Sequence, residues 1–262
     1  MIGVVIPAHN EAALIGPCVH SVQVAAAHPQ LAGERVLIVV VADSCSDSTE
    51  AIAVSLGALV LSTFKRNVGS ARDLGARLIV AHEARWLAFT DADTTVPADW
   101  LVQQLECATD AVCGVITVSD WAGHHVETKA DFLGTYRDVE GHRHIHGANL
   151  GLSAAAYASV GGFQPLTFNE DVALVEALTK SGFSIAWTNK VRVATSARTS
   201  ARAPCGFGAT LRAVSNRFAG RPLGPLSAHA GFGPPGQADA ANDAKLNEPL
   251  LGGLPDVVTS LF

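Results

Sequence analysis

The chain is poor in features that mark several large classes of protein. Only 16% of its 262 residues are charged and 48% are hydrophobic, which excludes a disordered chain. Basic residues are in the minority, with 18 Lys and Arg against 24 Asp and Glu, and the net charge of −6 argues against a nucleic-acid partner. No apolar run reaches the roughly 18 residues of a membrane-spanning helix, so we expect no transmembrane segment.

Cysteine pairs with functional spacing are also missing. The number of cysteines is odd, and no two of them have the CxxC spacing, which argues against a zinc or redox motif. The five cysteines are Cys18, Cys45, Cys107, Cys113 and Cys205. Reduced thiols in a cytoplasmic protein are the expected state. Neither a basic segment nor a cleavage site of small residues follows Met1, so we expect no signal peptide.

Four common catalytic or nucleotide-binding motifs are absent. The sequence contains no GxSxG nucleophile elbow, no GxxxxGK[ST] phosphate loop and no HExxH zinc motif. It also has no GxGxxG fingerprint between a predicted strand and a predicted helix: the pattern occurs only at 231–236, in the expected loosely packed tail, and this lowers the expectation of a dehydrogenase.

Predicted strands and helices alternate through the first hundred residues. Short β-branched runs predict strands at 2–6, 36–41, 58–62 and 86–90. Helices are predicted from a cap at Asn10 and over 49–56, 70–83 and 100–109. This alternation predicts an α/β fold with a mainly parallel sheet flanked by helices.

Polar clusters follow three of these strands. Since ligands bind such sheets at the carboxyl ends of the strands, we expect a site where these clusters meet: residues 7–11, 43–47 and 91–93.

The second half has a weaker pattern. Strands are predicted at 112–119, 183–187 and 191–194, and helices at 154–160 and from a cap at Asn169 to about 181. We expect a nucleotide-binding half over 1–110 and an acceptor half over 111–205, which together form one domain. Residues 206–262 are expected to hold a helix near 207–218 and a loosely packed tail, a candidate contact for a homo-oligomer.

Asp91-Ala92-Asp93 is the strongest chemical signal. Two carboxylates at i and i+2 after a hydrophobic strand can reach one point, and such oxygens suit Mg²⁺ or Mn²⁺. The metal would neutralise the charge on a leaving diphosphate. A surface turn or a helix cap is the alternative for this tripeptide.

Five segments in order resemble the family-two inverting glycosyltransferases of the GT-A fold. They are Ile2-Gly3-Val4-Val5-Ile6-Pro7-Ala8-His9-Asn10-Glu11, Val41-Ala42-Asp43-Ser44-Cys45-Ser46-Asp47, Asn67-Val68-Gly69-Ser70-Ala71-Arg72-Asp73-Leu74-Gly75, Asp91-Ala92-Asp93, and Gly162-Phe163 followed by Asn169-Glu170-Asp171. The resemblance covers about residues 2–200. It implies a GT-A-like α/β domain whose second half receives the acceptor.

The resemblance also implies a role for individual residues. Those expected to contact the donor nucleotide or its phosphates are Pro7, Ala8, Glu11, Asp43, Arg72 and Asp91. Among these, Asp43 would bind the base, uracil or guanine, and Asp91 would contact the ribose or the metal's surroundings. Asp93 would ligate the metal, and Asp171 would be the general base that deprotonates the acceptor hydroxyl.

Structural interpretations compete with these roles. Asp43 and Asp47 could close a turn. Glu170 and Asp171 could serve only a helix amino terminus, although that position would also tend to keep Asp171 ionised, as a base requires. Arg72 could be a plain surface charge on its helix.

Two further features stand near the predicted acceptor side. His142, His144 and His146 alternate, so on an extended segment their rings share one face, where they could bind zinc, face substrate or be solvated. His146 is the expected donor-side residue because the following residues resemble the family's segment near the donor sugar. Many relatives carry an aromatic or longer basic motif after the base; here Thr195-Ser196-Ala197-Arg198 is the nearest candidate, with Arg198 as a diphosphate partner or a surface charge.

These observations predict a metal-dependent inverting glycosyltransferase that uses a UDP- or GDP-sugar and an unknown acceptor hydroxyl. The alternatives are a catalytically inactive nucleotide-sugar binding module, a sugar nucleotidyltransferase and a donor hydrolase. A nucleotidyltransferase usually has a Gly-rich basic loop after the first strand, and residues 8–13 contain none. Both Asp93 and Asp171 are present, which argues against an inactive module.

Overall fold

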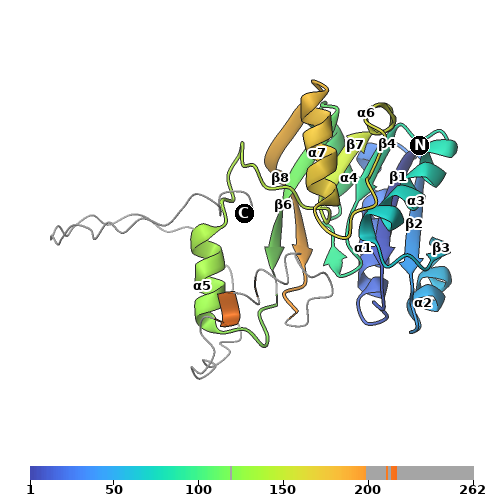
Figure 1. The fold of residues 1–262 in the computed structure, drawn as a ribbon. Helices are drawn as coiled ribbons and strands as arrows, with labels where there is room; N and C mark the ends of the chain where they lie inside the picture. The colour runs from blue at the N-terminus through green and yellow to red at the C-terminus, as the bar shows by residue number, and fades with distance from the viewer. Residues whose placement is uncertain (119, 199–210, 212–213, 217–262) are drawn as a thin grey trace.

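The computed structural model describes residues 1–118, 120–198, 211 and 214–216 (Figure 1). The strands are β1 (Ile2–Ala8), β2 (Val36–Asp43), β3 (Leu59–Thr63), β4 (Trp86–Phe89), β5 (Thr94–Thr95), β6 (Ala111–Val118), β7 (Leu150–Ser153) and β8 (Ile185–Thr195). The helices are α1 (Ile15–Ala26), α2 (Thr49–Ser55), α3 (Val68–Ala81), α4 (Trp100–Glu106), α5 (Val126–Thr135), α6 (Ala154–Ser159) and α7 (Glu170–Lys180), with a 3₁₀ turn at Pro29–Leu31.

All eight strands belong to one sheet, in the order β3-β2-β1-β4-β7-β6-β8-β5. The four strands from β3 to β4 are parallel, as the alternation of the first half predicts. Strand β7 is antiparallel to both of its neighbours, β4 and β6, so β4 and β6 point the same way. The two halves of the chain therefore share one continuous sheet.

Two layers of apolar side chains bury the sheet. Alternate residues of β1 point to opposite faces: Val4 and Ile6 pack with α1, α2 and α4, while Val5 packs with α3, α6 and α7. Every residue of β1 is buried, which is the pattern of a central strand covered on both faces. Burying one such Val or Ile side chain contributes about 1.5–3 kcal/mol. The continuous apolar runs of the first half therefore supply much of the free energy that stabilises the central strands of the sheet.

The predicted helix start at Asn10 is wrong. Asn10 has a left-handed φ of 53°, and its side-chain oxygen accepts the backbone N–H of Ser46 rather than one from a following helix. The chain turns through 11–14, and α1 begins at Ile15. The turn brings Glu11 beside the start of α2, where its N–H donates to the Thr49 hydroxyl at 2.7 Å.

The second half contains elements that the sequence pattern did not predict. Helix α5 forms within the polar stretch 124–146, and β7 forms just before α6. The two strands predicted at 183–187 and 191–194 are one strand, β8, whose pairing with β6 shifts register between Cys113 and Val115. The predicted cap at Asn169 makes no side-chain hydrogen bond to α7, because its backbone is in the left-handed conformation with φ 57°.

Most of the predicted helix at 207–218 and all of the tail from 222 lie outside the described residues. Figure 1 shows α5 standing apart from the helices that cover the sheet. Its buried side chain Phe132 packs with Ala197 and Leu211. No helix within the described ranges combines the length and apolar character needed to cross a membrane.

We predict that Gly75→Ala destabilises the fold, although alanine favours helices. A Cβ at Gly75 would lie 2.6 Å from Val5 Cγ1 and 3.0 Å from Val41 Cγ2, on buried β-branched side chains that cannot swing away. The expected loss is about 1–3 kcal/mol by chemical denaturation. Gly16→Ala is the matched control on α1: its Cβ would meet Ile52 at 3.8 Å, and the variant should gain about 0.5–1 kcal/mol. Equal effects at both positions would contradict this packing argument.

Candidate active site

The predicted site residues gather at the carboxyl edge of the parallel strands. Ala8 ends β1, Asp43 ends β2, and Asp91 follows β4 by two residues. The register places Ala8 opposite Ala42, so the β1 and β2 ends lie side by side. Segments far apart in sequence therefore meet at one edge for a topological reason, as the alternation of strands and helices predicts.

The Asp91-Ala92-Asp93 turn is held between β4 and β8. The backbone N–H of Thr94 donates to the Asp91 carbonyl at 3.0 Å, and β5 then pairs Thr94 with Thr195. The N–H of Ser196 donates to the Asp93 carbonyl at 3.2 Å. These bonds fix the backbone of the turn, so both carboxylates start from a defined position.

Arg72 lies beneath the turn and is almost completely buried. Its guanidinium donates to Asp91 Oδ1 at 2.5 Å and to the carboxylate of Glu170 at the start of α7. It also lies over the Phe163 ring, 5.9 Å from the centroid. The interpretation of Arg72 as a surface charge is therefore wrong: it joins α3, the Asp91 turn and α7.

The backbone at Gly147 fits closely against this guanidinium. A Cβ there would lie 2.4 Å from Arg72 Nη2, so only glycine allows the approach. The Gly147 N–H in turn donates to Asp171 Oδ2 at 2.7 Å. The segment after His146 thus links Arg72 to the predicted base.

Asp171 is a partly buried carboxylate at the amino terminus of α7. Oδ1 accepts the N–H of Val172 at 2.8 Å and Oδ2 that of Gly147. These bonds and nearby Arg72 favour the ionised form, but burial outweighs them and raises the pKa of Asp171 above its ordinary value. The helix terminus does act in the expected direction, yet burial dominates.

Arg198 follows β8 and connects the turn after β1 with the turn after β4. Its guanidinium donates to Glu11 Oε2 at 2.8 Å and pairs with Asp93 Oδ2 at 2.9 Å. The Ser196 hydroxyl accepts the Arg198 N–H at 3.2 Å. The interpretation of Arg198 as a plain surface charge is therefore wrong.

This region has more negative than positive charge. The carboxylate cluster is defined as Glu11, Asp91, Asp93, Glu170 and Asp171. The first four pair with the guanidinium groups of Arg72 and Arg198, and Asp171 is close enough to Arg72 to feel its charge. Burial and the neighbouring charge of Asp91 raise the pKa of Asp93 to about 6. The nearby charge of Arg198 lowers this pKa, but it does not offset burial and the negative charge of Asp91, so the positive charge around Asp93 falls short.

That shortage fits a divalent cation. Asp91 and Asp93 offer hard oxygen ligands, and a cation there would add the missing positive charge. Within the described ranges no three Asp, Glu, His or Cys side chains converge on one point. The donor set therefore suits a cation that is completed by ligand oxygens, such as phosphate, rather than one enclosed by protein.

Asp43 and Asp47 both hold turns. Asp43 accepts the backbone N–H groups of Arg66 at 2.8 Å and Asn67 at 2.7 Å, which fixes the segment before α3. Asp47 accepts the N–H of Thr49 at 3.0 Å and that of Ala12 at 3.1 Å. Asp43 still lies at the end of β2, beside Ala8 and the rest of the predicted nucleotide pocket.

The three alternating histidines do share a face, where their rings stack. Neighbouring ring centroids lie 5.2 Å apart for His142 and His144, and 5.8 Å apart for His144 and His146. Tyr136 joins the stack and its hydroxyl bonds His146 Nε2 at 3.0 Å. Burial and the two neighbouring imidazoles lower the pKa of His146 to about 3, so this ring is neutral. The stack supports the segment leading to Gly147, and the solvated interpretation is wrong for the buried rings of His142 and His144.

Sequence analysis did not identify Glu170 as the partner of Arg72 or Tyr136 as the partner of His146. Glu170 and Arg72 are 98 residues apart, and no local pattern connects them. Tyr136 lies just beyond α5, an element that was not predicted. The only local signal for Glu170 was its position beside Asp171.

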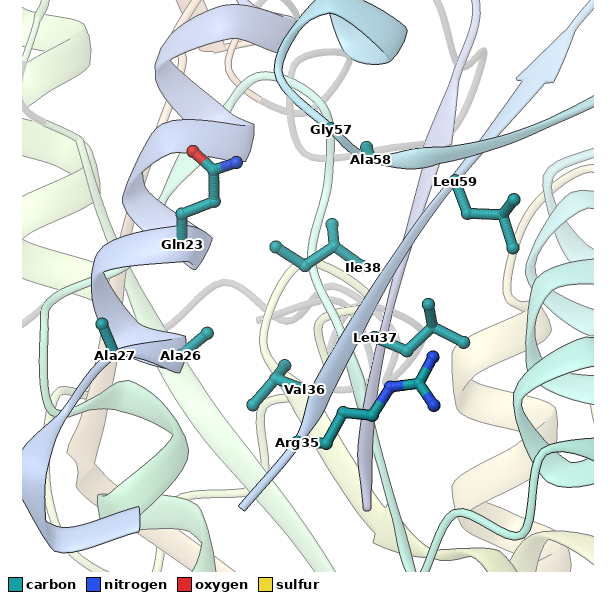
Figure 2. A pocket seen from close by; sticks show the side chains of 10 residues that line it. All are labelled: Gln23, Ala26, Ala27, Arg35, Val36, Leu37, Ile38, Gly57, Ala58 and Leu59. Carbon is teal, nitrogen blue, oxygen red and sulfur yellow. The ribbon is translucent and has the colours of Figure 1, made fainter. Parts of the chain in front are cut away.

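A separate groove of about 620 Å³ lies at the opposite end of the sheet (Figure 2). It is bounded by the end of α1 and the beginnings of β2 and β3, with Gln23, Arg35 and mainly apolar side chains around it. None of the predicted site residues lines this groove. The carboxyl edge is therefore the better candidate for the chemistry.

The family model described as "Glycosyl transferase family 2" matches residues 3–156, more than half of the chain. A search of curated proteins found no match. Among solved structures, S. aureus TarS 1-349 in complex with UDP-GlcNAc aligns with a TM-score of 0.61 at 14% identity, covering 79% of this chain and 61% of that one.

Two other structures give the same picture of the fold. The mannosyltransferase PcManGT from Pyrobaculum calidifontis, in complex with GDP-Man and Mn²⁺, has a TM-score of 0.58 at 18% identity and covers 82% of this chain and 61% of its own. Glucosyl-3-phosphoglycerate synthase from Mycobacterium tuberculosis, in complex with phosphoglyceric acid, has a TM-score of 0.53 at 20% identity, with 76% and 72% covered. The chain thus spans less than two thirds of TarS 1-349 and PcManGT, and at these identities the likeness shows the GT-A fold alone.

We predict that Arg72→Met lowers the free energy of unfolding by about 3 kcal/mol, because it leaves the Glu170 carboxylate buried without its partner. Urea denaturation would measure the loss. Arg77→Met on the same helix is the control, since Arg77 is exposed where it pairs with Asp73, and it should change stability little. The double variant Arg72→Met/Glu170→Gln should recover part of the loss. Similar losses for the two single variants would contradict the importance of the buried pair.

Proposed function

Because the chain belongs to glycosyl transferase family 2, we propose that it transfers a sugar from a nucleoside diphosphate sugar to an acceptor hydroxyl. The observation that carries this proposal is the meeting of Asp93, Arg198 and Asp171 around one acidic cluster at the carboxyl edge of the sheet. This arrangement offers a cation ligand, a phosphate partner and a base.

The donor side of the proposed site is the first half of the sheet. Pro7, Ala8 and Glu11 would line the nucleotide pocket, and Asp43 would contact the base. The Asp43 carboxylate already accepts two backbone N–H groups and the Ser44 hydroxyl, so it would reach a uracil or guanine edge with the remaining lone pair of Oδ2. The ligands in the titles of TarS and PcManGT, UDP-GlcNAc and GDP-Man, support a UDP- or GDP-sugar.

Asp93 and Asp91 would hold Mg²⁺ or Mn²⁺, and the Mn²⁺ in the PcManGT structure supports such a cation. The cation would stabilise the charge that develops on the departing diphosphate. Arg72 would act from beneath: it holds Asp91 in place and adds a positive charge near the phosphates. His146 would contribute by supporting the segment at Gly147, beside the expected donor sugar.

Asp171 would be the general base of an inverting displacement. Each oxygen accepts one N–H group, and each keeps lone-pair capacity to take the acceptor proton. The raised pKa makes the carboxylate a stronger base than an exposed aspartate. The acceptor oxygen would attack the anomeric carbon from the side opposite the diphosphate, which inverts that centre. We propose that residues 1–110 bind the donor and 111–205 receive the acceptor.

We predict that UDP or GDP raises the melting temperature of the full chain only when Mn²⁺ is present. At about one hundred times its Kd, a ligand that binds only the folded state stabilises it by about 2.7 kcal/mol, which corresponds to a rise of roughly 5–10 °C. Differential scanning fluorimetry would measure the shift and identify the base.

Asp93→Ala should abolish this shift, whereas Asp110→Ala should preserve it. Asp110 bonds Ser184 where β6 and β8 begin, at the end of the sheet away from Asp93. If neither nucleotide shifts the wild-type chain under any metal, the donor proposal fails.

We predict that Asp171→Asn lowers the transfer rate by roughly 10²–10⁴-fold, the usual contribution of a general base, and leaves nucleotide affinity nearly unchanged. In the wild type the rate should fall as pH drops through the pKa of Asp171, because the protonated carboxyl cannot accept the acceptor's proton. The raised pKa places this fall above the 3.8 of an ordinary aspartate. Stopped assays of transfer at several pH values would test both statements. A variant that keeps wild-type turnover, with Asp110→Asn as the unaffected control, would show that another group is the base.

A further inference from the structure

Arg198 pairs with Asp93, the proposed cation ligand, and with Glu11 of the proposed nucleotide pocket. Its two terminal nitrogens bridge Glu11 Oε2 at 2.8 Å and Asp93 Oδ2 at 2.9 Å. The side chains of Glu11 and Asp93 are only 7% and 13% exposed, while that of Arg198 is 24% exposed. The accessible member of this group is therefore the arginine, and it covers the carboxylate expected to ligate the cation.

The position of Arg198 is set by its backbone. Ser196 bonds both the Asp93 carbonyl and the Arg198 N–H, and Thr94 pairs with Thr195 in the sheet. A planar guanidinium with parallel N–H groups suits two carboxylates at once. This side chain supplies part of the positive charge that the carboxylate cluster needs.

The same position opposes cation binding at Asp93 Oδ2. A divalent ion and the guanidinium would compete for one carboxylate oxygen, and at close range they repel each other. A diphosphate changes this balance, because it offers the guanidinium new acceptor oxygens and offers the cation further ligands. Arg72 cannot respond in the same way, because it is 4% exposed and held by Glu170 and Asp91.

We propose that Arg198 couples cation binding to diphosphate binding: without nucleotide it occupies Asp93 and Glu11, and the diphosphate draws it away so that the cation binds Asp93. The inference rests on the proposed function, since it assumes a nucleoside diphosphate and a cation at this site. Coupling between two ligands is reciprocal, so the nucleotide strengthens cation binding by the same factor as the cation strengthens nucleotide binding. Direct contact between phosphate and cation contributes to that factor in any variant, and Arg198 contributes the remainder.

The test is a titration of the full chain with Mn²⁺, followed by electron paramagnetic resonance of the free ion, with and without saturating UDP or GDP. The variants are Arg198→Gln and the control Arg192→Gln. Arg192 precedes Arg198 by six positions and pairs with Asp138 instead of the carboxylate cluster. Melting temperatures show whether each variant is folded.

We expect Arg198→Gln to bind Mn²⁺ without nucleotide at least roughly fivefold more tightly than the wild type, and to show a correspondingly smaller strengthening by nucleotide. Arg192→Gln should match the wild type in both measurements. If Arg198→Gln does not fold, Arg198→Lys replaces it: a single ammonium cannot bridge both carboxylates as a fork does, so Mn²⁺ binding should tighten in the same direction.

Two failures are distinguishable. If neither nucleotide strengthens Mn²⁺ binding to the wild type, the proposed function is wrong and the coupling with it. If nucleotide strengthens Mn²⁺ binding to the wild type, but the folded Arg198 variant shows unchanged or weaker Mn²⁺ binding without nucleotide, the coupling role of Arg198 is overturned while the proposed function stands.

Discussion

The buried guanidinium of Arg72 is the interaction on which the candidate site depends. It joins α3, the turn after β4 and the amino terminus of α7, and these three elements come from both halves of the chain. A charge in such a place is costly to bury unless it is paired, and Glu170 and Asp91 supply the pairing. The position of Asp171, which follows Glu170, is therefore tied to the same interaction that orients Asp91. A substitution that moves the Arg72 guanidinium would therefore shift both Asp91 and the start of α7.

The two arginines have different physical roles because they differ in burial. Arg72 is enclosed and held on two sides, which suits a fixed structural charge. Arg198 is partly exposed beyond the end of β8 and bridges two carboxylates, which suits the proposed exchange of one of these partners for a diphosphate. A site rich in carboxylates gains from this difference: the fixed charge maintains the geometry, and the accessible one can exchange partners.

Local patterns predicted the parts of the molecule that depend on local physics. The apolar runs of β1, β2 and β4 are long enough to be recognised, and Asp91 and Asp93 follow directly from the end of β4. Contacts across long separations had no such signal, as for Arg72 and Glu170 at 98 residues or Arg198 and Glu11 at 187. Helix α5 has only two buried residues, Thr128 and Phe132, so its periodicity is weak. Asn10 has the identity of a helix cap, but its left-handed backbone directs it to Ser46 instead.

The insertion of β7 between β4 and β6 has a consequence for the nascent chain. Strand β4 pairs with β1 on one side as soon as residue 89 is available, but its other side waits for Leu150–Ser153, about sixty residues later in synthesis. A nascent chain in which β4 pairs with β1 before β7 is made would expose an apolar strand edge at Trp86–Phe89. Such an edge pairs readily with strands of other chains. Strand β7 covers this edge in the folded chain, and a chain that stops short of β7 lacks both this cover and Asp171, the proposed base.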